Sequence, residues 1–331
     1  MIDINNLNYK IAVLGPIPRD YIITYAGEVI EKYGGINHPA IALSKLLNND
    51  STIIPVTHVR RRDEIPIKNI LSIYPNINLQ HISSNADQGD VIHLRFLDLN
   101  NRIEKQFAFM NPITPDDVKD LLDCDAFVIV PVTDFEVTLD TLKFIKKHSD
   151  AIVIFDAHGP TSSLSLSGDR FSKFWVDRDC WLPYIDILKM NQHEAKCSWF
   201  KKEYNLTDLE NKNALMEEEL QTFAEHCLVK GIKALYITLD SRGCLVYFTN
   251  NGQVQKKLIS SIKMEKVVDT TGCGDSFAAG VAFGTLVFKD YIKAAQYGNA
   301  LGAQRTQGKT FDVFKSYPET ERMVKKAYGD Y

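Results

Sequence analysis

The sequence predicts an α/β protein in which helices flank a mostly parallel sheet in three layers, with a small β-sheet added as a lid. Three observations support this fold class. Apolar runs of strand length alternate with segments of helical periodicity, which is the pattern of βαβ units. The runs are continuous rather than alternating, as in strands covered on both faces. Two polar, one-sided segments interrupt the alternation, and each has the pattern of a β-hairpin.

The predicted strands and helices follow one another along the whole chain. The strand candidates are residues 10–16, 51–56, 126–132, 151–156, 185–191 and 234–240. The helix candidates are residues 38–47, 63–74, 137–148 and 213–230, and the chain after residue 274, including 290–305 and 318–328. Units of strand, helix and strand form right-handed crossovers, so we expect a parallel sheet with helices on both sides.

The two predicted hairpins are residues 20–35 and 90–110, and the second has its turn at Asn100 and Asn101. Polar, one-sided strands do not fit inside a sheet that is buried on both faces. They are expected instead to form a lid over the carboxyl ends of the parallel strands. The predicted domains are a large α/β domain of residues 1–20, 34–88 and 111–331, and a β-lid of residues 21–33 and 89–110.

Composition and charge exclude several classes of protein. The chain has 331 residues and a formal net charge of -4, so nucleic acid is not expected as its main partner. No uninterrupted apolar run approaches the ~20 residues that span a bilayer, and the N-terminal residues have no apolar signal core. The 6 cysteines show no CxxC spacing, which argues against a zinc site or a secreted disulfide framework. We expect a soluble, cytoplasmic protein with no membrane partner.

Residues 269–275 read "DTTGCGD" and precede an apolar segment rich in small residues, including Gly280 and Gly284. A glycine pair before a helix lets backbone N–H groups face a ligand, and the helix dipole favours an anion there. Asp275 would lie in the first helical turn, close enough to a bound phosphate to accept the proton of an attacking hydroxyl. The alternative is a helix cap followed by an ordinary turn. The small residues predict close packing of the helix on the sheet.

The longer stretch "DTTGCGDSFAAGVAFG" resembles the second signature of the ribokinase-like carbohydrate kinases, the PfkB family. The resemblance implies that Asp275 is the catalytic base and that the amides of Gly272, Cys273 and Gly274 form an anion hole for the transferred phosphate. Asp269 and Thr271 match positions that bind a monovalent cation, such as K⁺, in some members.

Cys273 stands where the family usually has alanine. Small size explains the residue, and a thiol at a helix N-terminus can also have a lowered pKa. The sequence therefore raises the hypothesis that this thiol is open to oxidation and that peroxide slows the protein's activity.

The segment "YGGINHPAIALSKL" (33–46) resembles the first family signature, which implies that Gly34, Gly35 and Asn37 lie at the sugar site. It departs from the usual spacing, because Asn37 comes two residues after the second glycine rather than three, and Pro39 follows in the first helical turn, where proline is tolerated. The segment "LGPIPRD" ends the first predicted strand with Asp20, matching the family aspartate that accepts hydrogen bonds from substrate hydroxyls. The alternatives are turn formers at both places.

The segment "KMNQHEAK" matches the family's N-x-x-E motif, which implies that Asn191 and Glu194 hold Mg²⁺ through its waters. An alternative is a capped helix start. The segment "ITLDSRGCLVY" (237–247) resembles the part that borders the nucleotide: Thr238 and Gly243 match, whereas Asp240 replaces a glycine. Asn299 falls where the family often places a residue beside the adenine, and the alternative for a helical asparagine is exposure to solvent.

The resemblance runs from residue 10 to about residue 310 and implies a ribokinase-like fold with a lid that closes over the sugar and can form homodimers. It implies an ATP-dependent, Mg²⁺-assisted phosphotransferase acting on an alcohol group of a sugar or sugar derivative. A nucleoside kinase of the same fold and a non-catalytic sugar or nucleotide sensor are the alternatives. An oxidoreductase that binds a dinucleotide is disfavoured, because the first strand ends in "GPIPRD" rather than a GxGxxG turn.

Overall fold

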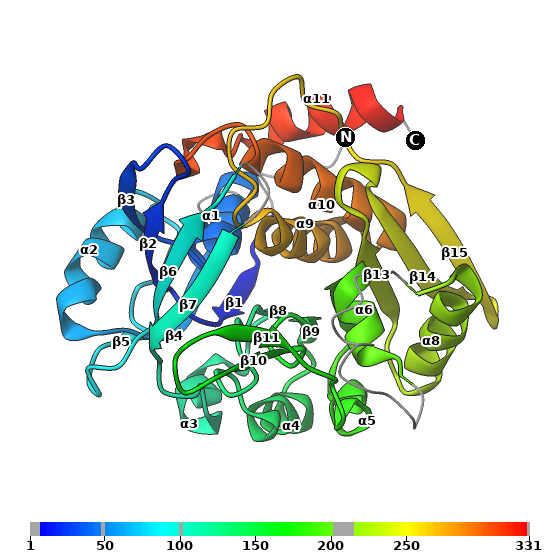
Figure 1. Ribbon diagram of the computed structural model, residues 1–331. Coiled ribbons are helices and arrows are strands. Elements are labelled where there is room, and N and C mark those ends of the chain that lie inside the picture. The colour runs from blue at the N-terminus through cyan, green and yellow to red at the C-terminus, as the bar shows by residue number, and fades with distance from the viewer. Residues whose placement is uncertain (1–6, 48–49, 99–101, 201–214, 330–331) are drawn as a thin grey trace.

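The computed structural model describes residues 7–47, 50–98, 102–200 and 215–329 (Figure 1). Within them, one large sheet forms the centre of the molecule. Its strands are β1 (Lys10–Leu14), β4 (Thr52–His58), β5 (Ile82–Ser83), β8 (Ala126–Ile129), β9 (Ile152–Asp156), β12 (Ile187–Asn191), β13 (Ala234–Thr238), β14 (Cys244–Asn250) and β15 (Gln253–Ile259). Their order across the sheet is β15-β14-β13-β12-β9-β8-β1-β4-β5.

The strands from β5 to β13 in this order are parallel, as predicted. The other edge is antiparallel, because β14 pairs with β13 and with β15. The chain turns between β14 and β15 at Asn251 and Gly252, whose φ angles of 50° and 76° are those of a two-residue hairpin turn. This antiparallel edge was not predicted.

Helices cover both faces of the large sheet (Figure 1). Successive residues of β1 alternate between two separate cores, with Ile11 and Val13 in one and Ala12 and Leu14 in the other. The first core is completed by α1 (Asn37–Leu46), α2 (Arg61–Leu71), α9 (Cys273–Phe288), α10 (Tyr291–Arg305) and α11 (Tyr317–Tyr328). The second is completed by α3 (Pro115–Val118), α4 (Leu139–His148), α5 (Arg178–Trp181), α6 (Gln192–Ser198) and α8 (Glu217–Val229). The predicted three-layer fold class is confirmed.

A second, smaller sheet lies at one end of the molecule (Figure 1). It consists of β2 (Arg19–Ile23), β3 (Val29–Tyr33), β6 (Val91–Phe96) and β7 (Arg102–Ala108), in the order β3-β2-β6-β7. Both predicted hairpins form, β2 with β3 and β6 with β7, and they join through the parallel pair of β2 and β6. The predicted turn at Asn100 and Asn101 lies outside the described residues.

Short elements complete the described chain. A two-stranded ribbon of β10 (Ser162–Leu164) and β11 (Arg170–Ser172) follows β9. Short 3-10 helices are η2 (Lys119–Leu121), η3 (Leu182–Tyr184), η4 (Asp240–Arg242) and η5 (Phe311–Val313). None of the helices in the described part of the chain has the length and apolar character needed to cross a membrane.

Helix α9, which begins at the glycine-rich loop, packs closely against α10. A Cβ atom on Gly280 would lie 2.4 Å from the backbone N of Gly298, and a Cβ atom on Gly284 would lie 2.4 Å from the Cα of Ala294. The small residues therefore allow two helices to approach each other, whereas the sequence predicted that they face the sheet. This contact fixes the start of α9 relative to the neighbouring loop after α10.

Candidate active site

The carboxyl ends of the parallel strands carry the polar side chains of the candidate site. Asp156 ends β9, Asn191 ends β12 and Thr238 ends β13. The register of the sheet places Asn191 beside Thr238, and Lys189 beside Asp156. Ligands of open α/β sheets bind at the carboxyl ends of the strands.

The glycine-rich loop has a shape that only glycine permits at residue 272. Gly272 precedes α9 with a left-handed φ of 82°, and a Cβ atom there would lie 2.4 Å from Cδ2 of His38. The backbone N–H of Cys273 donates to the carbonyl of Thr270 across 3.2 Å. The N–H groups of Gly274 and Asp275 come next, at the start of a helix of 16 residues, where the first turn has no preceding carbonyl to accept them. The loop thus offers backbone donors and a helix dipole to an anion.

A buried lysine lies directly behind this loop. A Cβ atom on Gly274 would be 2.9 Å from Nζ of Lys189, and that ammonium donates to Oδ2 of Asp156 across 2.6 Å. Burial alone would lower the pKa of Lys189, but the charges of Asp156 and Glu194 outweigh it and raise the pKa. Lys189 is therefore a permanent cation beside the anion-binding amides.

Asp275 lies in the first turn of α9 and is partly buried. Burial, reinforced by the nearby charge of Asp156, raises its pKa to about 6, although Lys189 and His158 act in the opposite direction. Within the described residues, its carboxylate forms no hydrogen bond or ion pair. Asp275 is thus a carboxylate that titrates near neutrality and is free to accept a proton.

Asn191 and Glu194 form a reciprocal cap at the start of α6. The Asn191 side chain accepts from the N–H of Glu194, and the Glu194 carboxylate accepts from the N–H of Asn191, both across 2.8 Å. His158 Nδ1 lies 3.0 Å from Oε1 of Glu194. Burial opposes ionisation of Glu194, but the hydrogen bond from His158 and the charge of Lys189 lower its pKa to about 2. The same hydrogen bond outweighs burial at His158 and raises the pKa of that imidazole.

These contacts decide how the site could hold Mg²⁺. Both oxygens of Glu194 already accept hydrogen bonds, Oε1 from the Asn191 side-chain amide at 2.8 Å and Oε2 from the Asn191 backbone. No group of three or more acidic, histidine or cysteine side chains among the described residues is arranged to hold a metal ion. Direct coordination therefore does not fit, whereas a hydrated ion whose waters contact the ionised Glu194 does.

The predicted acceptor residues lie together between the small sheet and α1. Asp20 on β2 is buried, and a Cβ atom on Gly34 would lie 2.5 Å from its Oδ2 atom. Gly35 has a φ of 56°, and a Cβ atom there would lie 2.1 Å from the carbonyl oxygen of Pro16. The glycine pair therefore lets the backbone come close to both the Asp20 carboxylate and the loop after β1.

Asn37 is fully buried at the first position of α1. Its side-chain amide donates to the carbonyl of Tyr33 across 3.3 Å, and its Oδ1 atom has no hydrogen-bond partner among the described residues. Buried polar atoms are normally paired, so this oxygen is available to a donor from a ligand. Pro39 is accommodated in the first turn, as predicted.

Comparisons with known proteins relate this site to one family. The pfkB family of carbohydrate kinases matches residues 150–311. A ribokinase from Lactococcus lactis is 23% identical over 316 residues, which cover 89% of this chain and 91% of that protein. A solved Arabidopsis thaliana ribokinase, complexed with ribose and ATP, has a TM-score of 0.69 at 17% identity and covers 96% of this chain and 99% of its own.

The chain resembles the pfkB family of carbohydrate kinases.

Two further relatives share higher identity with shorter parts of this chain. An uncharacterized sugar kinase from Archaeoglobus fulgidus is 38% identical over 90 residues, 27% of this chain and 34% of that protein. A 2-dehydro-3-deoxygluconokinase from Bacillus subtilis is 32% identical over 122 residues, 35% of this chain and 36% of that protein. The chain thus spans about a third of the length of these two relatives.

Asp240 replaces a glycine of the pfkB pattern, and the backbone explains why glycine is usual there. Asp240 has a left-handed φ of 53° and an exposed side chain. Aspartate tolerates this conformation better than most residues. Gly243 has a φ of 104°, and a Cβ atom there would lie 2.0 Å from the carbonyl oxygen of Ile259. Asp240 thus adopts the left-handed conformation in which glycine is favoured.

The other predicted nucleotide residues of the pfkB pattern have different surroundings. Thr238 hydrogen-bonds to the carbonyl of Met190 across 3.4 Å. Asn299 is buried rather than solvent-exposed, and its amide donates to the carbonyls of Ile259 and Ser260 and to the hydroxyl of Tyr328 at 3.0 to 3.2 Å. Its two amide hydrogens are thus shared among three oxygens of the chain itself.

Asp269 and Thr271, the predicted cation ligands of the pfkB pattern, lie in the glycine-rich loop. The backbone N–H of Thr271 donates to Oδ1 of Asp269 across 2.9 Å. Two cationic side chains reach the other oxygen, Lys32 at 3.0 Å and Arg305 at 2.8 Å. The carboxylate is therefore already neutralised by the chain.

The lowered pKa considered for Cys273 does not fit the structure, whereas the effect of peroxide stays a prediction. Burial raises the pKa of the Cys273 thiol to about 12, and the charge of Arg305, which acts in the opposite direction, does not compensate. The position at a helix N-terminus does not produce a thiolate here, because loss of solvent dominates. Small size accounts for the residue.

Several functional candidates were missed in the sequence. They are Asp156, His158, Arg170 and Lys189. Arg170, on β11, reaches the carbonyl of Val132 at 3.0 Å and the Gln106 side chain at 3.0 Å, and so ties the small sheet to the large domain. The available signal was the presence of polar residues at the ends of buried strands, in "FDAH" and "LKMN".

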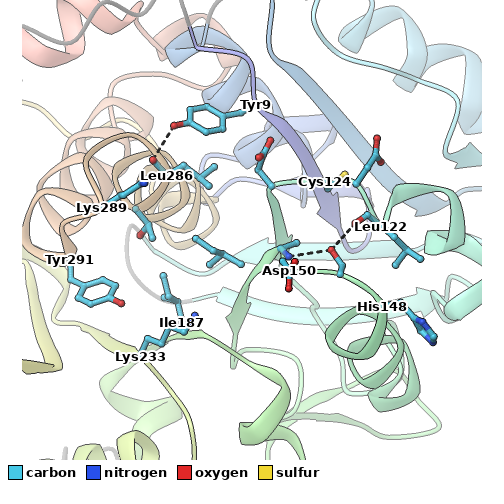
Figure 2. A pocket seen from close by; sticks show the side chains of 16 residues that line it. Tyr9, Leu122, Cys124, His148, Asp150, Ile187, Lys233, Leu286, Lys289 and Tyr291 are labelled. Atoms are coloured by element: carbon cyan, nitrogen blue, oxygen red, sulfur yellow. Dashed lines mark hydrogen bonds between the residues drawn. The ribbon is translucent and has the colours of Figure 1, made fainter. Parts of the chain in front are cut away.

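A cavity of about 710 Å³ lies at the amino ends of the parallel strands, opposite the candidate site (Figure 2). It is lined by residues at the amino ends of strands, such as Ile187 at the start of β12 and Lys233 just before β13, and by Tyr9, Leu286 and Tyr291. It is therefore separate from the pfkB-type site, which lies at the carboxyl ends.

Proposed function

We propose that the protein is an ATP-dependent kinase that phosphorylates an alcohol group of a sugar or sugar derivative. One observation carries this proposal: the partner-free Asp275, with a pKa of about 6, lies in the first turn of the helix that opens with the anion-binding glycine loop. A base placed beside a phosphate site is the arrangement required for phosphoryl transfer to a hydroxyl.

In the proposed reaction, each part of the site has one task. Asp20 and Oδ1 of Asn37 accept hydrogen bonds from hydroxyls of the acceptor and orient it. Asp275 accepts the proton of the attacking hydroxyl. The backbone amides of Gly272 and Gly274, with the Lys189 ammonium behind them, stabilise the negative charge of the transferring phosphoryl group, whereas the N–H of Cys273 donates to the carbonyl of Thr270. The geometry of the loop and the buried cation support this division of roles.

ATP is the proposed phosphoryl donor, with Thr238, Gly243, Thr271 and Asn299 as the residues expected to border it. A hydrated Mg²⁺ beside Asn191 and Glu194 would neutralise phosphate charge during transfer. The ionised state of Glu194, with a pKa lowered to about 2, supports this role. Because the amide hydrogens of Asn299 are engaged by the chain, this residue would form part of the wall of the ATP site rather than donate a hydrogen bond to ATP.

The small sheet is the proposed lid. Its strands lie within residues 19–33 and 91–108, so they begin two residues before the expected lid segment 21–33 and fall inside the expected segment 89–110. Arg170 and Lys32 connect the small sheet to the large domain. A lid over the acceptor would exclude water from the phosphoryl group. Pairing of two lids in a homodimer is a further expectation that follows from the family resemblance.

A panel of acceptors tests the proposal directly. Full-length protein is incubated with ATP, Mg²⁺ and a sugar, a sugar acid or a nucleoside, and ADP is measured. We expect one acceptor class to give turnover that depends on the acceptor. ADP production with nucleosides alone would assign a nucleoside kinase. Thermal stabilisation by an acceptor with no ADP would contradict the kinase proposal and indicate a sensor.

A further inference from the structure

The carboxylate of Asp269 accepts three hydrogen bonds within the described chain. Oδ1 accepts from the N–H of Thr271, and Oδ2 accepts from Lys32 and Arg305. Asp269 is 16% exposed, Lys32 18% and Arg305 only 1%. A K⁺ ion needs oxygen ligands with negative or dipolar charge, and here those positions are taken by donors.

Arg305 joins the end of α10 to the glycine loop and to the loop that follows α10. It is the last residue of α10, and its guanidinium donates through Nη2 to Asp269 and through Nη1 to the carbonyl of Gly308. The backbone also connects these segments, because the N–H of Val268 donates to the carbonyl of Thr306 across 2.7 Å. A carboxylate and a loop carbonyl are thus bridged by a fixed side-chain cation.

Lys32 brings a second positive charge from the small sheet. It lies on β3, and its ammonium reaches Asp269 from 237 positions away in the chain. One carboxylate facing two cations leaves a local charge of about +1, which repels a further cation. The same two cations, after burial, hold the pKa of His38 well below its ordinary value.

We propose that Arg305 and Lys32 are built-in cations that hold Asp269 and the glycine loop in place, so that this chain works without bound K⁺. Arg305 is the positioning residue, because it fixes Asp269, which holds the N–H of Thr271 just before Gly272. The K⁺ expected from the family resemblance does not fit the residues present. The kinetic part of the inference rests on the proposed function, whereas the binding part does not.

The test compares full-length wild type with Arg305→Gln and Lys32→Met at constant ionic strength. Tetramethylammonium chloride, an ion too large for such a site, is replaced stepwise by KCl, NaCl or LiCl, and both the melting temperature and the turnover of the best acceptor are measured. Lys309→Met is the matched control, since Lys309 is an exposed lysine paired with Glu28 at 3.2 Å near the same loop.

We expect wild type and Lys309→Met to show the same melting temperature and turnover in every salt. Arg305→Gln should lose about 100-fold in turnover in tetramethylammonium, as expected when a catalytic loop is displaced. KCl should increase the turnover of Arg305→Gln roughly tenfold and raise its melting temperature. Lys32→Met should show the same dependence more weakly and serves if Arg305→Gln does not fold.

A wild-type protein that is activated or stabilised by K⁺ over tetramethylammonium would overturn the inference. So would folded Arg305→Gln and Lys32→Met proteins that remain indifferent to K⁺. If no acceptor gives turnover, the proposed function fails, yet the melting temperatures still decide whether the chain binds K⁺.

Discussion

The Lys189 ammonium donates to the Asp156 carboxylate across 2.6 Å at the carboxyl ends of β12 and β9. Both side chains are buried, and the ammonium lies against Gly274 of the anion-binding loop. The pair sets the electrostatic surroundings of Asp275, because Asp156 raises and Lys189 lowers the pKa of that carboxyl. Burial is the main cause of the raised pKa of Asp275, and the buried ion pair adjusts it.

The pH dependence of turnover is the first prediction. Asp275 must be ionised to accept a proton, and its pKa is raised to about 6. The value of kcat/KM should therefore be constant above this pH and fall as the pH drops through about 6. A profile that is flat down to pH about 4, the ordinary range of an aspartate, would contradict the raised pKa.

Substitutions in the ion pair should move this acidic limb in opposite directions. Asp156→Asn removes a negative charge near Asp275 and should move the limb to lower pH, whereas Lys189→Met removes a positive charge and should move it to higher pH. Each variant leaves one buried charge unpaired, so unfolding in urea should show a loss of about 3–5 kcal/mol. Kinetics are measured at low temperature for this reason.

Lys233→Met provides the control for the ion-pair variants. Lys233 is an exposed lysine just before the amino end of β13, at the opposite end of the strands from Asp275. It pairs with Asp186 at 3.0 Å. Its loss should leave the acidic limb in place. Equal shifts in all three variants would show that the effect is not local to Asp275.

Gly272→Ala should impair both stability and turnover. The alanine would have to adopt a left-handed φ, and its Cβ atom would lie 2.4 Å from Cδ2 of His38. Gly252→Ala is a matched control, because Gly252 has a similar φ of 76° and nothing within 4 Å of its Cβ position. The control should cost about 1–2 kcal/mol in urea unfolding with unchanged kcat. Gly272→Ala should cost more and lower kcat about 100-fold; equal effects would remove the special role of this loop.

Substitutions at the proposed acceptor site should change KM for the acceptor. Gly34→Ala places a methyl group 2.5 Å from Oδ2 of Asp20, and Asp20→Asn removes the carboxylate charge. Both variants should raise KM for the acceptor and leave KM for ATP unchanged, because the contact concerns the acceptor alone. Gly27→Ala is a control in the same small sheet region, with nothing within 4 Å. A change confined to KM for ATP would contradict the placement of Asp20.

Local sequence patterns predicted most of the large sheet, because buried strands such as 10–14 and 152–156 are continuous apolar runs. The antiparallel edge of β14 and β15 was missed, although Asn251 and Gly252 carry a recognised hairpin signal. Strand β15 mixes apolar and charged residues, since this edge of the sheet is only partly covered, and β14 is buried only in its first half.

The site could be predicted only where its residues are neighbours in sequence. Asp275 and the glycines of 272–274 form one contiguous motif. Lys189 and Asp156 are 33 positions apart and meet through the sheet register, and Lys32 and Asp269 are 237 apart. Such contacts depend on tertiary structure, which explains why Lys189 was missed and why the cationic partners of Asp269 were not foreseen.

Asp275→Asn measures the central claim most directly. Turnover of the acceptor found in the panel is compared for wild type and variant, with urea unfolding as the check on folding. The raised pKa means that ionised Asp275 destabilises the folded protein as the pH rises through about 6, so the variant should be at least as stable at neutral pH. We predict a fall in kcat of about 10²–10⁴-fold with the acidic limb abolished. Near-normal turnover by a folded Asp275→Asn protein would contradict the assignment of Asp275 as the base.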